Sequence, residues 1–593
     1  MIGTYAAVVA ICASSLAIGQ AAIGLCGARR WSWPAPAVGL ALLCAVCWGT
    51  VRLPGDGVLS AVAVLVLTIA ALAYLRGRVE GAGEALAAGW PVALGALLAT
   101  ALPFIAEGHF GILGTSFNPD MSQHLLAADR LAEGNSSQLL VQGYPLGPHA
   151  IVVALNKGLG IGLVQGFTGL TIAVAVLASL TALAAFRDLP AIPRTAGALL
   201  VGLAYLVASY FAQGAFKETM QALYLLAFVL ALRESQRDWA TLNLRFVPAA
   251  LIAAGSAYTY SFPGLIWLGG TFVIWCLATL VSAAGGDDRE DSPGRESPRS
   301  ETGPAARPLG LAFLSFFVLT APELGRMLDF KKFETFDPNG PGLGNLFGQV
   351  SPFEALGIWP SGDFRLAPGD GAVPAIGYYL GIAFALVLLA YGLVWLWRRR
   401  ESAILSGLAA AALAYVAART VGTPYTAAKA IEIGAPLVAL AIVLPLAVEA
   451  SAVRLMSAVR AKGAPLYATL AGTAFVLAAG VCSLLALANA PVGPTSYSST
   501  LSEYRRVVGE GPTLVLASPQ LLEEEHGEPF LAWELRGGRV CIKSSDDPSV
   551  PPGVRFVVRD EGGWTLTRVR DPRPGKSPCP LIAVRQARQG PAK

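Results

Sequence analysis

The apolar stretches of about 18 to 24 residues that recur along most of this chain constrain its fold most strongly. Hydrophobic residues make up 54% of the sequence and charged residues only 14%, so a soluble core could not hide this much apolar surface. We therefore expect an all-α polytopic membrane protein with about fourteen transmembrane helices. The net charge of +4 is too small to indicate a nucleic-acid partner. The predicted spans cover residues 4–27, 35–52, 58–75, 85–105, 163–186, 195–213, 218–233, 246–261, 263–283, 308–325, 374–397, 402–418, 430–449 and 466–490.

The positive charges fall in alternate connections between these spans. Because arginine- and lysine-rich loops stay in the cytoplasm, we expect these connections on the inner side of the plasma membrane and both termini outside the cell. The residues that set this orientation are Arg29, Arg30, Arg76, Arg78, Arg187, Arg194, Arg233, Arg237, Arg245, Arg398 to Arg400, Arg454, Arg460 and Lys462.

The spans and the polar stretches divide the chain into five predicted regions. One of them, residues 284–307, is rich in charge, Pro, Ser and Gly, which is typical of a disordered cytoplasmic linker. Two long loops, 106–162 and 326–373, are expected outside. The regions are 1–84, extra N-terminal transmembrane helices; 85–283, a first membrane module; 284–307, the linker; 308–490, a second group of helices; and 491–593, an extracytoplasmic domain.

The tail after the last span has a different pattern. Short apolar runs at 512–517 and 554–558 alternate with turn-rich polar pieces, which predicts a small α/β domain. Outside the cell Cys541 and Cys579 could form a disulfide, although two free thiols in a packed domain fit the sequence equally well.

The other cysteines lie inside apolar stretches, where a thiol behaves as a small hydrophobe. Cys44 and Cys47 form a C-x-x-C pair, but no second pair or nearby histidine accompanies them. We expect them to pack in the protein interior.

Histidine is concentrated in one place. Three of the four histidines, His109, His124 and His149, fall in the predicted outside loop 106–162. Such clustering of an otherwise rare residue type points to chemistry in this loop.

The middle of this loop predicts a short helix over residues 120–133, preceded by an Asn-Pro pair. At helical spacing Asp120, Gln123 and His124 share one face, whereas Asp129 points the other way. A carboxylate beside an imidazole near the bilayer surface can take a proton from a hydroxyl or bind a divalent cation. The simpler alternative is that Asp120 caps the helix and His124 is an ordinary surface residue.

Two more groups of charge lie at outside ends of predicted spans. Lys217 and Glu218 open one span, and Tyr425, Lys429 and Glu432 line one helical face at the mouth of another. Lys429, at the mouth of an apolar span, can hold a phosphate at headgroup depth. The simpler alternatives are an interfacial pair at 217 and 218, and a Glu432 that merely neutralises Lys429.

Taken together, short motifs between residues 85 and 490 resemble those of bacterial GT-C fold membrane glycosyltransferases, especially the large uncharacterised actinobacterial-type members. The sequence differs from many of them in having a lone acid in the first large outside loop and three spans before the one that leads into it. The residues that carry the resemblance are Asp120, the segment from Tyr144 to His149, Lys217, Glu218, Tyr425 and Lys429.

This resemblance implies a direct, inverting displacement. Asp120 would deprotonate a hydroxyl of a glycan, lipid or protein acceptor, which attacks a polyprenyl-phosphate-linked sugar. Lys429, with Lys217 or a Mg or Mn ion, would stabilise the departing lipid phosphate. The resemblance also implies that the carboxyl-terminal domain helps to hold the acceptor. The expected substrate-binding residues are Gln123, His124, Tyr144, His149, Lys217, Glu218, Tyr425 and Lys429, and a cation would be held by Asp120 and His124.

Two other classes of function fit parts of the pattern. A multi-span transporter or lipid flippase also uses many spans with broken helices, and it predicts paired charges deep in the spans and inverted repeats. A polysaccharide polymerase or ligase would use similar lipid-linked substrates and would rely on outside arginines. The candidates for that role are Arg326, Arg365 and Arg419.

Overall fold

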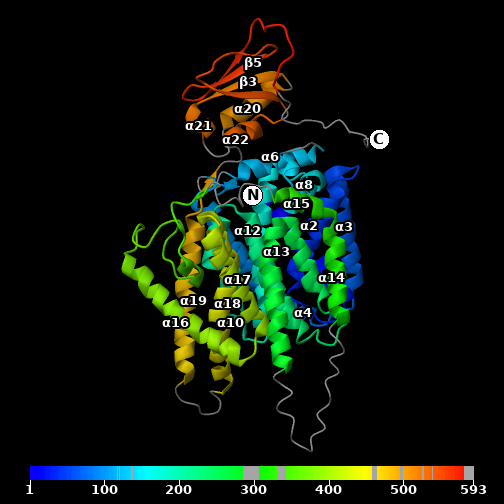
Figure 1. Cartoon of the computed structure of the whole chain (residues 1–593), viewed down its shortest axis with the longest axis vertical. Coiled ribbons are helices and arrows are strands. Elements are labelled where there is room, and N and C mark those ends of the chain that lie inside the picture. Colours follow the sequence, from blue (N-terminus) through cyan, green and yellow to red (C-terminus); the bar gives the residue numbers. More distant parts are fainter. Residues whose placement is uncertain are drawn as a thin grey trace, which may run out of the picture.

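We analysed a computed structural model of the chain, in which helices form a bundle and a small domain with a sheet lies at one end (Figure 1). Nearly all of the predicted linker lies outside the described residues, as does part of the loop 326–373. Arg460 and Lys462 also lie outside them. The structure describes residues 1–115, 118, 120–134, 138–284, 306–331, 342–456, 464–493, 499–509, 511–523, 527–536 and 538–579.

The helices of the bundle follow the apolar stretches of the sequence. They are α1 (Ile2–Leu25), α2 (Ala35–Val51), α3 (Asp56–Leu75), α4 (Ala82–Thr100), α5 (Leu102–Ala106), α9 (Leu163–Phe186), α10 (Ala191–Gly202), α11 (Tyr205–Ala212), α12 (Phe216–Ser235), α13 (Val247–Ala284), α14 (Ala306–Thr320), α15 (Leu324–Phe330), α16 (Ala375–Arg398), α17 (Ser402–Val421), α18 (Pro424–Met456) and α19 (Ala464–Ala488).

Ten helices within the described ranges are long and apolar enough to cross a membrane, or eleven if α10 and α11, which meet at a 51° bend, form one span. The chain is thus a multi-pass helical membrane protein by the length and composition of its helices. Each predicted stretch lies in a helix, but fourteen separate long spans are not shown by the described residues. Four stretches do not count separately, because 195–213 is broken in two, α2 is short, α12 carries charge at both ends, and 246–261 and 263–283 belong to the same element, α13.

Element α13 consists of two helical arms that are joined by a sharp reversal. The rings of Phe246 and Trp275 lie 5.6 Å apart, whereas a straight helix would separate these residues by roughly 40 Å. The reversal occurs at Ser261, whose φ of 58° is rare for a residue with a side chain, and Pro263 follows it. The two arms are therefore the two predicted segments 246–261 and 263–283, packed side by side.

Contacts between connections divide the bundle into two ends. At one of them Arg187 pairs with Asp238 at 2.6 Å, and Arg233 and Arg237 both bind Glu401, at 2.9 and 2.6 Å. The loop after α1 joins the same end, because Gly27 lies beside Leu242 and residues 30 and 80 form a β-bridge. We call this the arginine end, since it gathers the described arginines that alternate along the sequence.

The opposite end, which we call the domain end, carries the loop elements and the carboxyl-terminal domain (Figure 1). Short helices α6 (Met121–Ala132), α7 (Gln138–Val141) and α8 (Gly147–Leu159) cover the bundle here. Strand β1 (Ile112–Leu113) precedes them and pairs antiparallel with β2 (Val492–Gly493), which follows the last membrane helix.

The carboxyl-terminal domain contains a four-stranded sheet with the order β4-β3-β5-β6. Strand β3 is parallel to β4 and β5, and β6 is antiparallel to β5, as expected for a small α/β unit. A disulfide joins Cys541 and Cys579. The elements are α20 (Ser499–Val508), β3 (Pro512–Ala517), α21 (Pro519–Glu523), α22 (Gly527–Glu534), β4 (Arg539–Ser544), β5 (Phe556–Asp560) and β6 (Trp564–Arg568).

Helices α1 and α2 pack closely because glycine faces backbone on both sides. A Cβ at Gly39 would overlap the carbonyl oxygen of Ser15, and one at Gly19 would overlap that of Ala35. Small residues of this kind let membrane helices approach and gain dispersion contacts.

We predict that Gly39→Ala destabilises the protein by about 1–3 kcal/mol, because the added methyl group forces the two helices apart. Gly49→Ala is the matched control, since Gly49 lies in the same helix with nothing within 4 Å of a Cβ built there. Thermal unfolding in detergent should show a lower melting temperature for Gly39→Ala only. Equal melting temperatures for the two variants would contradict the close approach.

Candidate functional site

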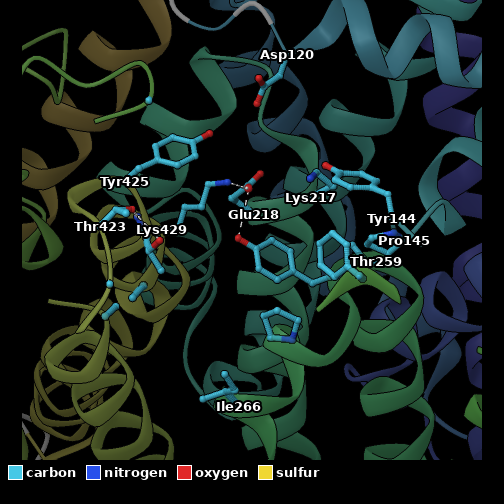
Figure 2. Close-up of a pocket in the computed structure, with 18 of the residues that line it drawn as sticks. Asp120, Tyr144, Pro145, Lys217, Glu218, Thr259, Ile266, Thr423, Tyr425 and Lys429 are labelled. Carbon is cyan, nitrogen blue, oxygen red and sulfur yellow. Dashed lines mark hydrogen bonds and ion pairs between the residues drawn. The ribbon is translucent and has the colours of Figure 1, made fainter. Parts of the chain in front are cut away.

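A cavity of about 390 Å³ opens at the domain end between α6, the residues before α8, α12, the tip of α13, and helices α17 and α18. It contains nearly every residue that the sequence singled out, although these come from elements far apart in the chain (Figure 2). The predicted residues on its wall are Asp120, Gln123, His124, Tyr144, Lys217, Glu218, Tyr425 and Lys429.

Asp120 lies immediately before α6, the helix predicted over 120–133. Its backbone N–H donates to Oδ1 of Asn118 at 2.9 Å, and within the described chain its carboxylate makes no capping hydrogen bond to the helix. In Figure 2 the carboxylate points into the cavity, above Lys217 and Glu218. The capping alternative therefore does not account for the direction of this side chain.

His124 and His149 form a pair, but only His124 lines the cavity. Nδ1 of His124 lies 3.1 Å from Nε2 of His149, which is completely buried among Tyr144, Phe167 and Phe216. Burial lowers the pKa of His149 to about 3, so this imidazole is neutral at physiological pH. His149, which we expected to bind substrate, lies behind His124 and can fix the orientation of its ring.

A buried ion pair at the cavity links two membrane helices. Nζ of Lys429 in α18 lies 3.0 Å from Oε1 of Glu218 in α12, and both side chains are largely buried. The hydroxyl of Tyr260, at the tip of α13, donates to the same oxygen at 3.3 Å. Three helices are therefore joined at one carboxylate, as the dashed lines in Figure 2 show.

Lys217 is held differently from its neighbour. Its ammonium lies 4.1 Å from the centre of the Tyr144 ring, a cation–π contact, and no carboxylate of the described residues forms an ion pair with it. Lys429 has a similar contact with Tyr425, also at 4.1 Å, in addition to its ion pair. Lys217 and Glu218 are thus not a simple interfacial pair, and the Lys217 ammonium is available to an anion in the cavity.

Glu432 does not neutralise Lys429. It is fully buried one turn further along α18, and neither carboxyl oxygen has a hydrogen-bond partner within the described chain. Glu218 takes its place, because a partner on another helix reaches the lysine more directly than the neighbour at i+3.

One side of the cavity is apolar and reaches the surface of the bundle. Ile266 of α13 and Val421 of α17 line it and are also 57% and 70% exposed. In a membrane, exposed apolar side chains at this level face lipid. The cavity therefore has a polar wall of acids and lysines and an apolar side whose residues also reach the surface of the bundle, and we call this side the lateral opening.

Asp120 and His124, where we expect a cation, both line the cavity. Among the described residues, no three His, Cys, Asp or Glu side chains gather in a way that could hold a metal ion. Glu218 binds Lys429, and Nδ1 of His124 faces His149. A cation at Asp120 and His124 stays a prediction.

The three arginines that we expected outside do not line this cavity. Arg326 binds the carbonyl oxygens of Leu140 and Tyr144 at 3.1 and 2.7 Å, which fixes α15 against the loop before α8. Arg365 pairs with Asp363 at 2.6 Å, and Arg419 is exposed.

Several residues on the cavity wall were not expected from the sequence. Tyr260 is the most important of them, and its signal in the sequence was its place beside the boundary between the predicted spans 246–261 and 263–283. Phe330, the last residue of α15, and Asn345 both fall in the predicted loop 326–373, and nothing in the local sequence connects that segment to Asp120.

No protein-family model matches this chain, and no curated protein matches its sequence. A functional assignment therefore depends on the arrangement of side chains at the cavity.

We predict that acid weakens the fold partly through His149. Its pKa is lowered on folding from an ordinary value of 6.5 to about 3. Between these values the unfolded chain binds a proton that the folded chain does not, so stability falls as the pH falls, by up to about 1.4 kcal/mol per pH unit. Melting temperatures measured from pH 7 to pH 4.5 should fall less steeply for His149→Gln than for the unchanged protein.

The matched control is His109→Gln, because His109 is exposed in the same loop and contacts only the carbonyl of Glu107 among the described residues. It should follow the unchanged protein. If His149→Gln showed the same pH slope as that control, His149 would not be buried as a neutral imidazole in the folded protein.

Proposed function

We propose that this protein is a GT-C-type membrane glycosyltransferase that moves a sugar from a polyprenyl-phosphate donor to a hydroxyl of an extracytoplasmic glycan, lipid or protein. The observation that carries the proposal is the convergence of Asp120, Lys217 and the Lys429–Glu218 pair on one cavity. Transfer from such a donor requires an acid, cationic groups for the phosphate and an apolar side for the lipid chain.

The donor fits the cavity by chemistry. A lipid-linked sugar phosphate has an apolar chain, an anionic phosphate and a polar sugar in that order. The chain can leave the cavity past Ile266 and Val421 into lipid, while the phosphate lies near Lys217 and Lys429. The sugar then faces Asp120 at the top of the cavity (Figure 2).

The proposed reaction is a single displacement. Asp120 takes the proton of the acceptor hydroxyl, and the oxygen attacks the anomeric carbon and forms the new glycosidic bond. The bond from that carbon to the phosphate oxygen breaks, and its electron pair stays on the phosphate. Lys217 and Lys429 stabilise the charge that grows there, and no step requires a bound cation.

Glu218, Tyr260 and His149 then serve to orient the reacting groups. Glu218 and Tyr260 keep the Lys429 side chain at the cavity wall, and His149 fixes the ring of His124. His124 and Gln123, on the same face of α6 as Asp120, are placed to bind hydroxyl groups of the sugar or acceptor.

The sidedness of the cavity supports transfer outside the cytoplasm. The arginine-rich connections gather at the end of the bundle opposite the cavity, and such connections are retained in the cytoplasm. On this basis we propose that the cavity and the carboxyl-terminal domain lie on the extracytoplasmic face of the plasma membrane.

We predict that Asp120→Asn lowers the transfer rate at least about 100-fold, because the amide cannot accept the hydroxyl proton. The measurement uses protein reconstituted in nanodiscs, a panel of radiolabelled polyprenyl-phosphate sugars and a cell-envelope extract as acceptor. Glu133→Gln is the control: Glu133 lies at the end of α6, is exposed and pairs with Lys157 rather than facing the cavity. Unchanged transfer by Asp120→Asn would rule out its role as the base.

A transporter of lipid-linked anions is the second candidate, and one observation favours it. The Glu218–Lys429 pair and the buried Glu432 lie in helices α12 and α18, as a charged translocation pathway requires. The same nanodisc assay separates the two, since a transporter forms no glycosidic bond. A flippase would instead move a labelled polyprenyl phosphate across a proteoliposome bilayer without changing it.

A further inference from the structure

Helix α6 lies between the membrane bundle and the carboxyl-terminal domain, and its two sides contact different partners (Figure 1). Leu125 and Ala128 are completely buried, while Leu126 packs against the apolar core of the carboxyl-terminal domain. The side that carries Gln123 and His124 lines the cavity. A shift of the domain therefore acts directly on the helix that follows Asp120.

The contact between α6 and the domain has a charged element. Nε of Arg536, just after α22, lies 3.5 Å from Oδ1 of Asp129, and both side chains are about three-quarters covered, with exposures of 24% and 26%. The Arg536 guanidinium also stacks on the Trp533 ring at 3.6 Å and donates to the Trp533 carbonyl oxygen at 2.7 Å. The arginine is thus held in one direction, which favours a defined position of Asp129.

A second attachment lies on the other side of Asp120 in the sequence. Strand β1 pairs with β2, and the N–H of Gly114 donates to the carbonyl oxygen of Pro491 at 2.8 Å. The N–H of Gly493 donates to Oγ1 of Thr115 at 3.1 Å. Asp120 therefore lies between two attachments. Residues 112–115, which precede it, bind the start of the carboxyl-terminal region, and Asp129, which follows it, binds the domain.

We propose that Asp129 and Arg536 are positioning residues through which the carboxyl-terminal domain holds Asp120, Gln123 and His124 against the cavity. Neither residue lines the cavity, so they act through α6 and not on a substrate. The proposal rests on the proposed function only for its effect on catalysis, because the position of α6 can be measured without a substrate. Small displacements matter here, since a misplacement of about 1 Å can lower a rate about 100-fold.

The test uses the full chain in nanodiscs and the variants Arg536→Glu, Asp129→Arg and the exchange of both charges. Amide hydrogen exchange of residues 121–132 should become at least about tenfold faster in each single variant and return toward the original rate in the exchanged pair. Arg570→Glu is the control, because Arg570 is exposed on the same domain and forms no ion pair within the described chain. It should leave the exchange rate unchanged.

Transfer kinetics give the second readout. Each single variant should lower kcat about 10- to 100-fold with little change in the donor KM, and the exchanged pair should regain most of the loss. Unchanged exchange of 121–132 in Arg536→Glu would overturn the proposal, whether or not the protein transfers sugars. Faster exchange without rescue by the exchanged pair would overturn it as well, since the effect would then not depend on the pair. If no variant or original protein transfers sugar while the exchange pattern holds, the proposed function fails and the positioning of α6 stands.

Discussion

An apolar membrane bundle tolerates a charge only where another group compensates it, and the cavity is organised by this constraint. Glu218 is compensated by Lys429 and Tyr260, so one carboxylate joins α12, α18 and the tip of α13. Lys217 is compensated more weakly, by the face of Tyr144. The charge of Glu218 is therefore satisfied within the protein, whereas the Lys217 ammonium can still bind an anion in the cavity.

The strain at the tip of α13 belongs to the same arrangement. Ser261 has a backbone conformation that few residues with a side chain adopt, and the reversal there brings Tyr260 to Glu218 and the second arm to the lateral opening. The amide of Gln221 in α12 holds both arms, through the Ser256 hydroxyl at 2.7 Å and the Gly264 carbonyl at 2.9 Å. A straight helix at this position could supply neither contact.

Local sequence patterns were sufficient for the features that depend on neighbouring residues. The apolar stretches predicted the helices, helical spacing placed Asp120 and His124 on one face of α6, and the apolar run at 512–517 became β3. Pairings across the fold could not be read in this way. Glu432 is the neighbour of Lys429 by helical spacing, yet Glu218 is its partner. Which of the two histidines faces the cavity depends on how α6 packs on α8. The reversal within α13 and the bend between α10 and α11 depend on packing, so hydropathy alone could not predict how these segments are joined.

The central claim is that the two lysines of this cavity bind the phosphate of a lipid-linked donor. The most direct measurement is an electron cryomicroscopy structure of the full chain in nanodiscs with a polyprenyl phosphate. The account predicts phosphate density in contact with Lys217 and Lys429, below Asp120, with the lipid chain leaving past Ile266 and Val421. Phosphate density at the arginine end, or an empty cavity at saturating ligand, would contradict it.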